Sequence, residues 1–174
     1  VWQMLLCEIM PYAHTIQFYF QGEPLLNPDL PKMIHEAHEA GIYTIVSTNA
    51  QEITPRLADA LVQSGLNRII ISLDGLSPKS YNAYRIGGDF EKVREALRLL
   101  HTTKHRLHSR TPVIEWQCVR LRTNEHEWAE IRRVYRQWGA DCLTFKTAQL
   151  YDYASGNPLM PTNPRYARYF CGKD

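Results

Sequence analysis

The chain has 174 residues, a formal net charge of +2, 44% hydrophobic residues and 22% charged residues. These values predict a folded domain with a sizeable core and exclude an intrinsically disordered chain. Lysine and arginine are scattered along the sequence, so no nucleic-acid partner is indicated. No apolar run approaches the roughly 20 residues that span a bilayer, so no membrane partner is expected either.

The cysteines Cys7, Cys118, Cys142 and Cys171 lie far apart in the sequence. They form neither a CxxC-type ligand motif nor a disulfide framework, so we expect reduced thiols and a cytoplasmic protein. The first three fall in expected helices or strands, where a cysteine is most often a small core residue. Because the sequence begins at Val1 rather than methionine and stops abruptly, we expect it to be an excerpt cut at both ends.

Helices and strands alternate in the first half of the chain. Apolar residues recur at helical spacing over 1–12, and the β-branched and aromatic run 15–20 is typical of a strand. An amphipathic helix over 29–40 then precedes a second strand at 42–47. A third helix follows over 54–64, with a threonine and a proline at its start.

The second half continues the alternation. In chain order we expect a buried strand over 68–73, a loop with a short helix over 77–85, a helix over 89–105, a strand over 113–121, a helix capped by Asn124 that runs to 138, and a strand over 142–147. From 151 onward Pro, Gly and Asn dominate, which predicts an extended surface segment or linker.

This alternation predicts an α/β fold with a parallel sheet built by right-handed crossovers. An open doubly wound sheet and part of a (β/α) barrel both fit. In either architecture a ligand binds at the carboxyl edge of the strands.

Polar residues gather at that edge after successive apolar strands, which predicts a small-molecule pocket. They are Gln21, Gly22, Glu23 and Pro24 after the first strand, Thr48 and Asn49 after the second, Ser72 and Asp74 after the third, Gln117 on the fourth, and Lys146 on the fifth. Arg85 lies in the long connection after the third strand.

The chemistry of these residues suits a small ligand that carries charges. Glu23 and nearby carbonyls suit a cationic amine, Ser72 and Asp74 can hold ribose hydroxyls, and Arg85 can pair with a carboxylate. Plain structural roles remain open for each: a turn for Glu23, a cap for Asp74, and a solvated surface position for Arg85. Because Arg85 lies in a loop, we expect its replacement to cost little stability. Lys146 is either functional or a lysine whose head reaches solvent at a strand end.

The strand ends together resemble the radical S-adenosylmethionine (radical SAM) superfamily, most closely its branch with a C-terminal SPASM domain, which includes maturases of peptides and proteins. The resemblance rests on four motifs in the expected order: FYFQGEPLLNPDL (18–30), STNAQEIT (47–54), RIIISLDGLSPKSYNAYRIGG (68–88) and VIEWQCVRLRTNEHE (113–127).

The resemblance implies a partial (β/α)6 TIM-like barrel of which strands two to six are present. Residues 1–150 would form the radical SAM core, and 151–174 a linker toward a SPASM-like domain outside this sequence.

It also implies roles for the strand-end residues. Gln21 to Pro24 match the GGEP-type motif that holds the methionine amino group, with Gln21 in place of the first glycine. Ser72 and Asp74 match the motif near the ribose and the methionine carboxylate, which Arg85 also contacts, and Thr48 and Asn49 line the same pocket. Gln117 and Lys146 are better placed for substrate.

The implied cofactors are SAM and a [4Fe-4S] cluster held by a CxxxCxxC motif. We expect that motif upstream of Val1, so no cysteine here is a cluster ligand and the chain alone is expected to be inactive. The implied reaction is reductive cleavage of SAM to a 5′-deoxyadenosyl radical that takes a hydrogen atom from substrate, with a peptide or protein as one candidate substrate. The electron donor would be a flavodoxin or ferredoxin.

Two other functions fit the residues. One is a Schiff-base enzyme on a TIM-type barrel, with Lys146 as the nucleophile. The other is a degenerate barrel that binds a ligand or partner without catalysis.

Overall fold

A computed structural model describes residues 1–151, 153 and 156–168, so Cys171 lies outside the described residues. Its strands are β1 (Thr15–Gln17), β2 (Tyr43–Thr48), β3 (Arg68–Ser72), β4 (Val113–Arg120) and β5 (Cys142–Thr147). Its α-helices are α1 (Trp2–Ile9), α2 (Leu30–Glu39), α3 (Pro55–Gln63), α4 (Pro78–Asn82), α5 (Phe90–Arg106) and α6 (Trp128–Val134). Short 3₁₀ helices are η1 (Pro24–Leu26), η2 (Glu125–Glu127) and η3 (Pro164–Tyr166).

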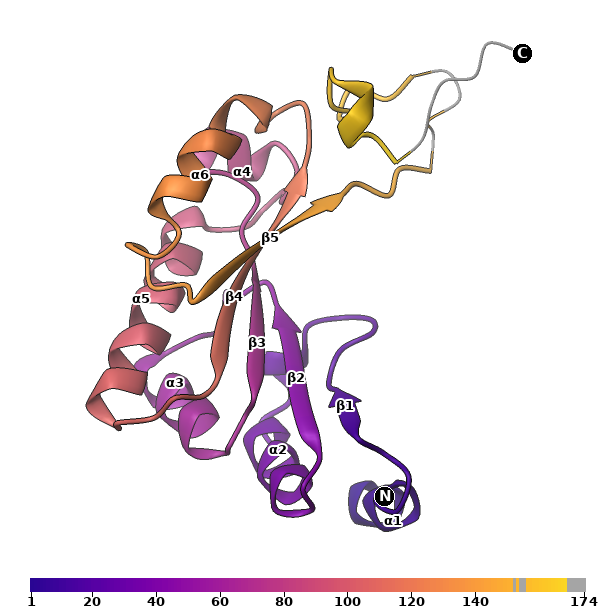
Figure 1. Cartoon of the computed structure of the whole chain (residues 1–174), viewed down its shortest axis with the longest axis vertical. Helices are drawn as coiled ribbons and strands as arrows, with labels where there is room; N and C mark the ends of the chain where they lie inside the picture. The colour runs from indigo at the N-terminus through magenta and orange to yellow at the C-terminus, as the bar shows by residue number, and fades with distance from the viewer. Residues whose placement is uncertain (152, 154–155, 169–174) are drawn as a thin grey trace.

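The strand order decides between the two predicted architectures. The five strands pair in parallel in the order β1-β2-β3-β4-β5. A doubly wound sheet reverses its order at a switch point, and this sheet does not. Right-handed crossovers therefore return on the same side each time, and the helices between the strands cover one face (Figure 1). The partial (β/α) barrel is confirmed, and the doubly wound alternative is wrong.

Two helices begin as their sequence predicts. The Thr54 side chain accepts a hydrogen bond from the backbone N–H of Leu57, and Pro55 opens α3. The Asp89 carboxylate accepts from the N–H groups of Glu91 and Lys92 at the start of α5. These bonds satisfy donors that have no partner within a helix.

Three local predictions are wrong. Asn124 makes no capping bond: η2 follows it, and α6 begins only at Trp128. β1 ends at Gln17, and Phe20 is 95% exposed, because the chain turns away from the sheet to form the loop before η1. Cys7 is exposed rather than part of the core.

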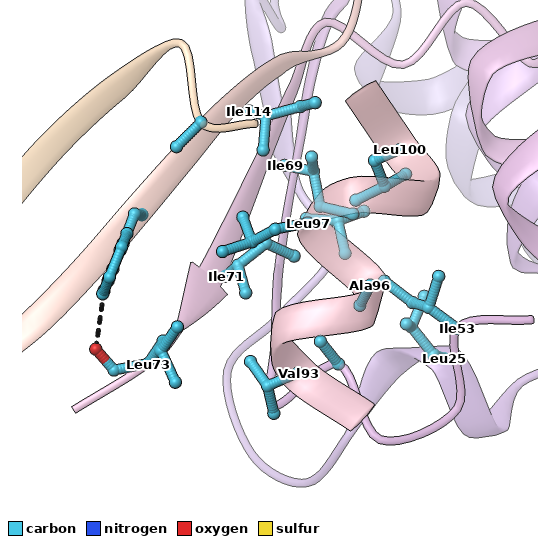
Figure 2. Packing of buried hydrophobic residues seen from close by; sticks show 14 of the residues in the cluster. Leu25, Ile53, Ile69, Ile71, Leu73, Val93, Ala96, Leu97, Leu100 and Ile114 are labelled. Atoms are coloured by element: carbon cyan, nitrogen blue, oxygen red, sulfur yellow. Dashed lines mark hydrogen bonds between the residues drawn. The ribbon is translucent and has the colours of Figure 1, made fainter. Parts of the chain in front are cut away.

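The core lies between the sheet and its helices. Val93, Ala96, Leu97 and Leu100 recur at helical spacing along α5 and are buried, and Figure 2 shows them beside alternate residues of β3. Trp116 of β4 is also fully buried. Its indole N–H donates to the Leu73 carbonyl oxygen at 2.6 Å, the bond drawn as a dashed line at Leu73 in Figure 2. Every second residue of these strands therefore faces the helices and forms the core side of the sheet.

The described part of the expected linker contacts the core. The Tyr166 ring lies edge-on to Trp128 at 5.1 Å between centroids, and the Arg120 guanidinium lies 4.4 Å from the Tyr166 centroid. Leu159 and Met160 pack beside Leu121. The division of the chain at residue 150 stays a prediction. None of the helices in the described residues has the length and hydropathy needed to cross a bilayer.

Replacing Leu97 by alanine should lower the free energy of unfolding by about 2–5 kcal/mol, because Leu97 is fully buried and its loss leaves a cavity. The matched control is Leu26→Ala, since Leu26 is 68% exposed and should change stability by no more than about 0.5 kcal/mol. Urea denaturation followed by circular dichroism measures both. Equal effects of the two substitutions would contradict the packing described here.

Candidate functional site

A pocket of about 450 Å³ opens at the carboxyl ends of β1, β2 and β3. Its volume lies within the range of small-molecule sites. The lining residues are Tyr19, Phe20, Gly22, Glu23, Ser47, Thr48, Asn49, Ser72 and Arg85. Six of the residues predicted from the sequence are therefore brought together here: Gly22, Glu23, Thr48, Asn49, Ser72 and Arg85.

The Glu23 carboxylate is held in place by three donors. One oxygen, Oε1, accepts from the Thr48 hydroxyl at 2.6 Å and from the Leu25 N–H at 3.1 Å. The other, Oε2, accepts from the Asn49 N–H at 2.8 Å. The sequence places these donors together because η1 begins directly after Glu23 and β2 ends at Thr48.

This arrangement leaves acceptor capacity on Glu23. A carboxylate offers about four acceptor positions, and the three hydrogen bonds occupy three of them. Gly22 precedes it with φ of +78°, a left-handed conformation that favours glycine and turns the chain into the pocket. Glu23 is thus a fixed anion with room for one more donor.

Arg85 brings the opposite charge to the pocket. Its Nε donates to Asp74 Oδ2 at 2.6 Å, and its other guanidinium N–H groups have no hydrogen-bond partner among the described residues. Asp74 is fully buried and also accepts from the Val119 N–H at 2.5 Å. Burial raises the pKa of the Asp74 carboxyl, and the Arg85 guanidinium acts in the opposite direction. Because Arg85 partners a buried acid, the expectation that its replacement costs little stability loses its basis.

The other predicted residues lie outside the pocket lining. Gln21 is exposed, Pro24 is the first residue of η1, and Asp74 lies behind Arg85. Gln117 and Lys146 are farther along the sheet on β4 and β5. Lys146 is exposed rather than buried on its strand.

Sequence reasoning missed three residues that line the pocket. Ser47 is the last-but-one residue of β2 and is in register with Ile70, which lies two residues before Ser72 and so shares its face; the signal for Ser47 was therefore the strand pairing, which the local sequence does not show. Tyr19 and Phe20 were assigned to the first strand, whereas they belong to the loop that follows it.

Asn124, predicted from the sequence as a helix cap, has a different role in the structure. Its Oδ1 accepts from the Leu121 N–H at 3.0 Å and from the Trp128 indole N–H at 2.8 Å. Its Nδ2 donates to the carbonyl oxygens of Asp74 at 3.1 Å and Val119 at 2.9 Å. The side chain therefore joins the segment that follows β3 to the end of β4.

A hollow of similar size, about 440 Å³, lies between α5 and the turn at Trp138. Its charged side chains are already paired, Arg94 with Glu91 at 2.8 Å and Arg98 with Glu95 at 2.5 Å. The pocket at Glu23 and Arg85 is the better ligand site, because its two charges keep free hydrogen-bonding positions.

No group of three or more His, Cys, Asp or Glu residues that could hold a metal ion occurs within the described residues. Cys118 is buried, which raises the pKa of its thiol and disfavours the thiolate that binds metals. Burial likewise raises the pKa of the Cys142 thiol. The residues that the structure describes do not fit a [4Fe-4S] cluster, and we assign no cluster ligand to them.

One family profile matches more than half of the chain. Residues 11–115 match the family profile described as "Radical SAM superfamily". A probable GTP 3′,8-cyclase of Methanococcus vannielii is 41% identical over 76 residues, which are 44% of this chain and 25% of that protein. A PqqA peptide cyclase of Ruegeria pomeroyi is 46% identical over 67 residues, 38% of this chain and 17% of that protein. The chain thus spans a quarter or less of the length of these two relatives.

Solved structures share the fold. Streptococcus suis SuiB bound to S-adenosylmethionine superposes with a TM-score of 0.70 at 16% identity, covering 93% of this chain and 36% of that one. Native anSMEcpe with bound AdoMet gives a TM-score of 0.65 at 20% identity, covering 88% of this chain and 45% of that one. At these identities the likeness concerns the fold alone.

Replacing Arg85 by methionine should destabilise the chain more at pH 7 than at pH 4. Because the pKa of Asp74 is raised in the folded state, the folded chain binds more protons than the unfolded chain at pH values above the ordinary Asp pKa of about 3.9. The free energy of unfolding therefore falls as the pH rises from that value through the raised pKa of Asp74. Without Arg85 the ionised Asp74 carboxylate has no neighbouring cation. We therefore expect the free energy of unfolding to fall by roughly 2 kcal/mol at pH 7. This is less than for a fully buried pair because the Arg85 side chain is 30% exposed.

Urea denaturation at the two pH values measures this effect. The double variant Arg85→Met, Asp74→Asn should recover part of the loss at pH 7, because no charge is then left buried. Arg98→Met serves as the control, since Arg98 pairs with Glu95 on the exposed face of α5. A loss for Arg85→Met that is independent of pH would refute the coupling to Asp74.

Proposed function

Because the chain belongs to the radical SAM superfamily, we propose that its pocket between Glu23 and Arg85 binds the methionine part of S-adenosylmethionine. Members of this superfamily are enzymes that use SAM together with a [4Fe-4S] cluster. We propose the same class of activity for the protein to which this chain belongs.

One observation carries the proposal: the pocket presents a fixed anion and a fixed cation, each with free hydrogen-bonding capacity. The methionine part of SAM is a zwitterion with an α-ammonium and an α-carboxylate. The fourth acceptor position of Glu23 suits the ammonium, and the free guanidinium N–H groups of Arg85 suit the carboxylate.

The remaining pocket residues have supporting roles in this proposal. Thr48 and the Asn49 N–H orient the Glu23 carboxylate and do not need to touch the ligand. Ser72 lines the pocket with a hydroxyl that suits a ribose or carboxylate oxygen. Asp74 acts through Arg85, whose guanidinium it orients, instead of binding the ribose itself.

Bound SAM, when reduced by one electron from a [4Fe-4S] cluster, supplies a 5′-deoxyadenosyl radical that takes a hydrogen atom from a substrate. The contribution of this chain is to hold the methionine end in one orientation. No residue described here ligates the cluster, so we propose that its ligands lie outside this sequence. An external one-electron donor such as a flavodoxin or ferredoxin would serve the intact enzyme.

The substrate class and the SPASM branch belong to the proposal as well. The curated relatives include both a GTP cyclase and a peptide cyclase, so the superfamily match leaves the substrate open. A peptide substrate, as the SPASM branch would imply, is supported by fold neighbours solved with bound peptides, anSMEcpe with the Kp18Cys peptide and SuiB with precursor peptide SuiA. A Schiff-base enzyme is not favoured, because Lys146 is exposed and lacks the apolar pocket that activates such nucleophiles.

Glu23→Gln should weaken SAM binding by roughly tenfold or more while the chain stays folded, because one anionic acceptor becomes an amide. Glu52→Gln is the matched control, since Glu52 is exposed outside the pocket lining. Calorimetric titration with SAM measures the affinity, and circular dichroism measures the fold. Equal affinities of the two variants would rule out Glu23 as the ammonium partner.

In the intact enzyme, formation of 5′-deoxyadenosine from SAM under reducing, anaerobic conditions measures the proposed activity directly. The Glu23→Gln enzyme should form it more slowly, and the Glu52→Gln enzyme at the original rate. Intact protein that takes up iron and binds SAM, yet forms no 5′-deoxyadenosine, would favour a degenerate barrel without catalysis.

A further inference from the structure

The helix-free face of the sheet carries a row of polar side chains that lead away from the pocket. Ser72 of β3 is in register with Gln117 of β4, and Gln117 is in register with Thr144 of β5. Lys146 lies two residues beyond Thr144 on the same strand, in register with Val119. Residues two apart on a strand share a face, so Lys146 and Thr144 point to the same side.

The alternation along β5 identifies that side. Leu143 and Phe145 pack against the core beneath the helices. Thr144 and Lys146, which alternate with them, therefore face away from the helices. Ser72 lines the pocket and is the pocket end of the row. Because neighbouring strands lie about 4.8 Å apart, Thr144 lies roughly 10 Å from Ser72 across the sheet.

None of these four side chains makes a hydrogen bond or ion pair within the described part of the chain. The two arginines near the same face are already matched, Arg68 with Glu115 at 2.6 Å and Arg85 with Asp74 at 2.6 Å. Lys146 is therefore a cation of this face without an acidic partner among the described residues. A polar row of this kind, next to a pocket, is suited to a ligand rather than to holding the fold.

We propose that Gln117, Thr144 and Lys146 bind the substrate, and that Lys146 pairs with a carboxylate group of that substrate. This inference rests on the proposed function, because it makes the neighbouring pocket the SAM site. The charges favour a carboxylate over a triphosphate: one unpaired lysine beside two neutral polar groups balances a single negative charge. The amide of Gln117 and the hydroxyl of Thr144 complete a set of hydrogen-bonding groups for the atoms around that carboxylate.

The test is a titration of the ¹⁵N-labelled chain followed by two-dimensional NMR. The probes are N-acetylglutamate amide, its neutral counterpart N-acetylglutamine amide, a pentapeptide with a central glutamate, and GTP. We expect the glutamate probe to shift the Gln117 and Thr144 signals, and the glutamine probe to leave them unchanged. Lys146→Met should raise the dissociation constant of the glutamate probe roughly tenfold. The matched control Lys92→Met should not, since Lys92 is exposed on α5.

The different probes distinguish the kinds of substrate that could supply the carboxylate. A pentapeptide that binds more tightly than the free amino-acid probe indicates a peptide substrate, and equal affinities indicate a small acid. Equal affinity of the Lys146→Met and Lys92→Met variants for the glutamate probe would overturn the inference. Stronger binding of GTP than of either carboxylate probe, lost in Lys146→Met, would overturn it in favour of a phosphate.

A parallel SAM titration keeps this outcome distinct from that of the proposed function. SAM should shift the signals of Gly22 and Asn49, which line the pocket. Shifts there without any carboxylate effect at Thr144 reject the substrate site alone. A carboxylate effect at Thr144 without any SAM-induced shift at Gly22 and Asn49 rejects the SAM site. The carboxylate site would then remain, but its assignment as a substrate site would be rejected with the SAM site.

Discussion

Parallel pairing of the strands in chain order constrains the whole architecture. Each right-handed crossover must return on the same side of the sheet, so the helices between the strands cover one face and the other stays free of them (Figure 1). All strands also end at the same edge, which gathers residues from 19 to 85 into one pocket. The candidate site and the free polar face are thus consequences of the strand order, and the core behind them supplies the rigidity.

The two charges of the pocket are supported in different ways. Glu23 is oriented by neutral donors from the end of β2 and the start of η1. Arg85 is oriented by a buried acid whose other oxygen bonds to the backbone of β4. The anion therefore depends on local loop geometry, whereas the cation depends on the register of β3 and β4. The affinity for a ligand that contacts both charges would therefore depend on the alignment of three neighbouring strands.

Local patterns predicted most of the elements but not the contacts between them. The β-branched run at Ile69 to Ile71 and the cap at Thr54 depend on neighbouring residues, and both are present as expected. The pairing of Asp74 with Arg85 depends on the path of an intervening loop, which no local pattern encodes. The residues before α6 have a local sequence typical of a helix cap, so Asn124 was interpreted as one. The pocket position of the five residues that follow or end the first three strands was predictable because parallel strands share an edge, whereas Arg85 reaches the pocket from the long connection after β3.

Asn124 uses its full hydrogen-bonding capacity, with two bonds accepted and two donated. Aspartate has the same shape, yet it would turn both donated bonds into contacts between oxygens, and leucine would satisfy none of the four. Substitutions at this position are therefore expected to be poorly tolerated, whereas the side chain of the neighbouring His126 is 72% exposed and is less constrained. Redesign of the loop between β4 and α6 should keep this asparagine and vary exposed residues such as His126 instead.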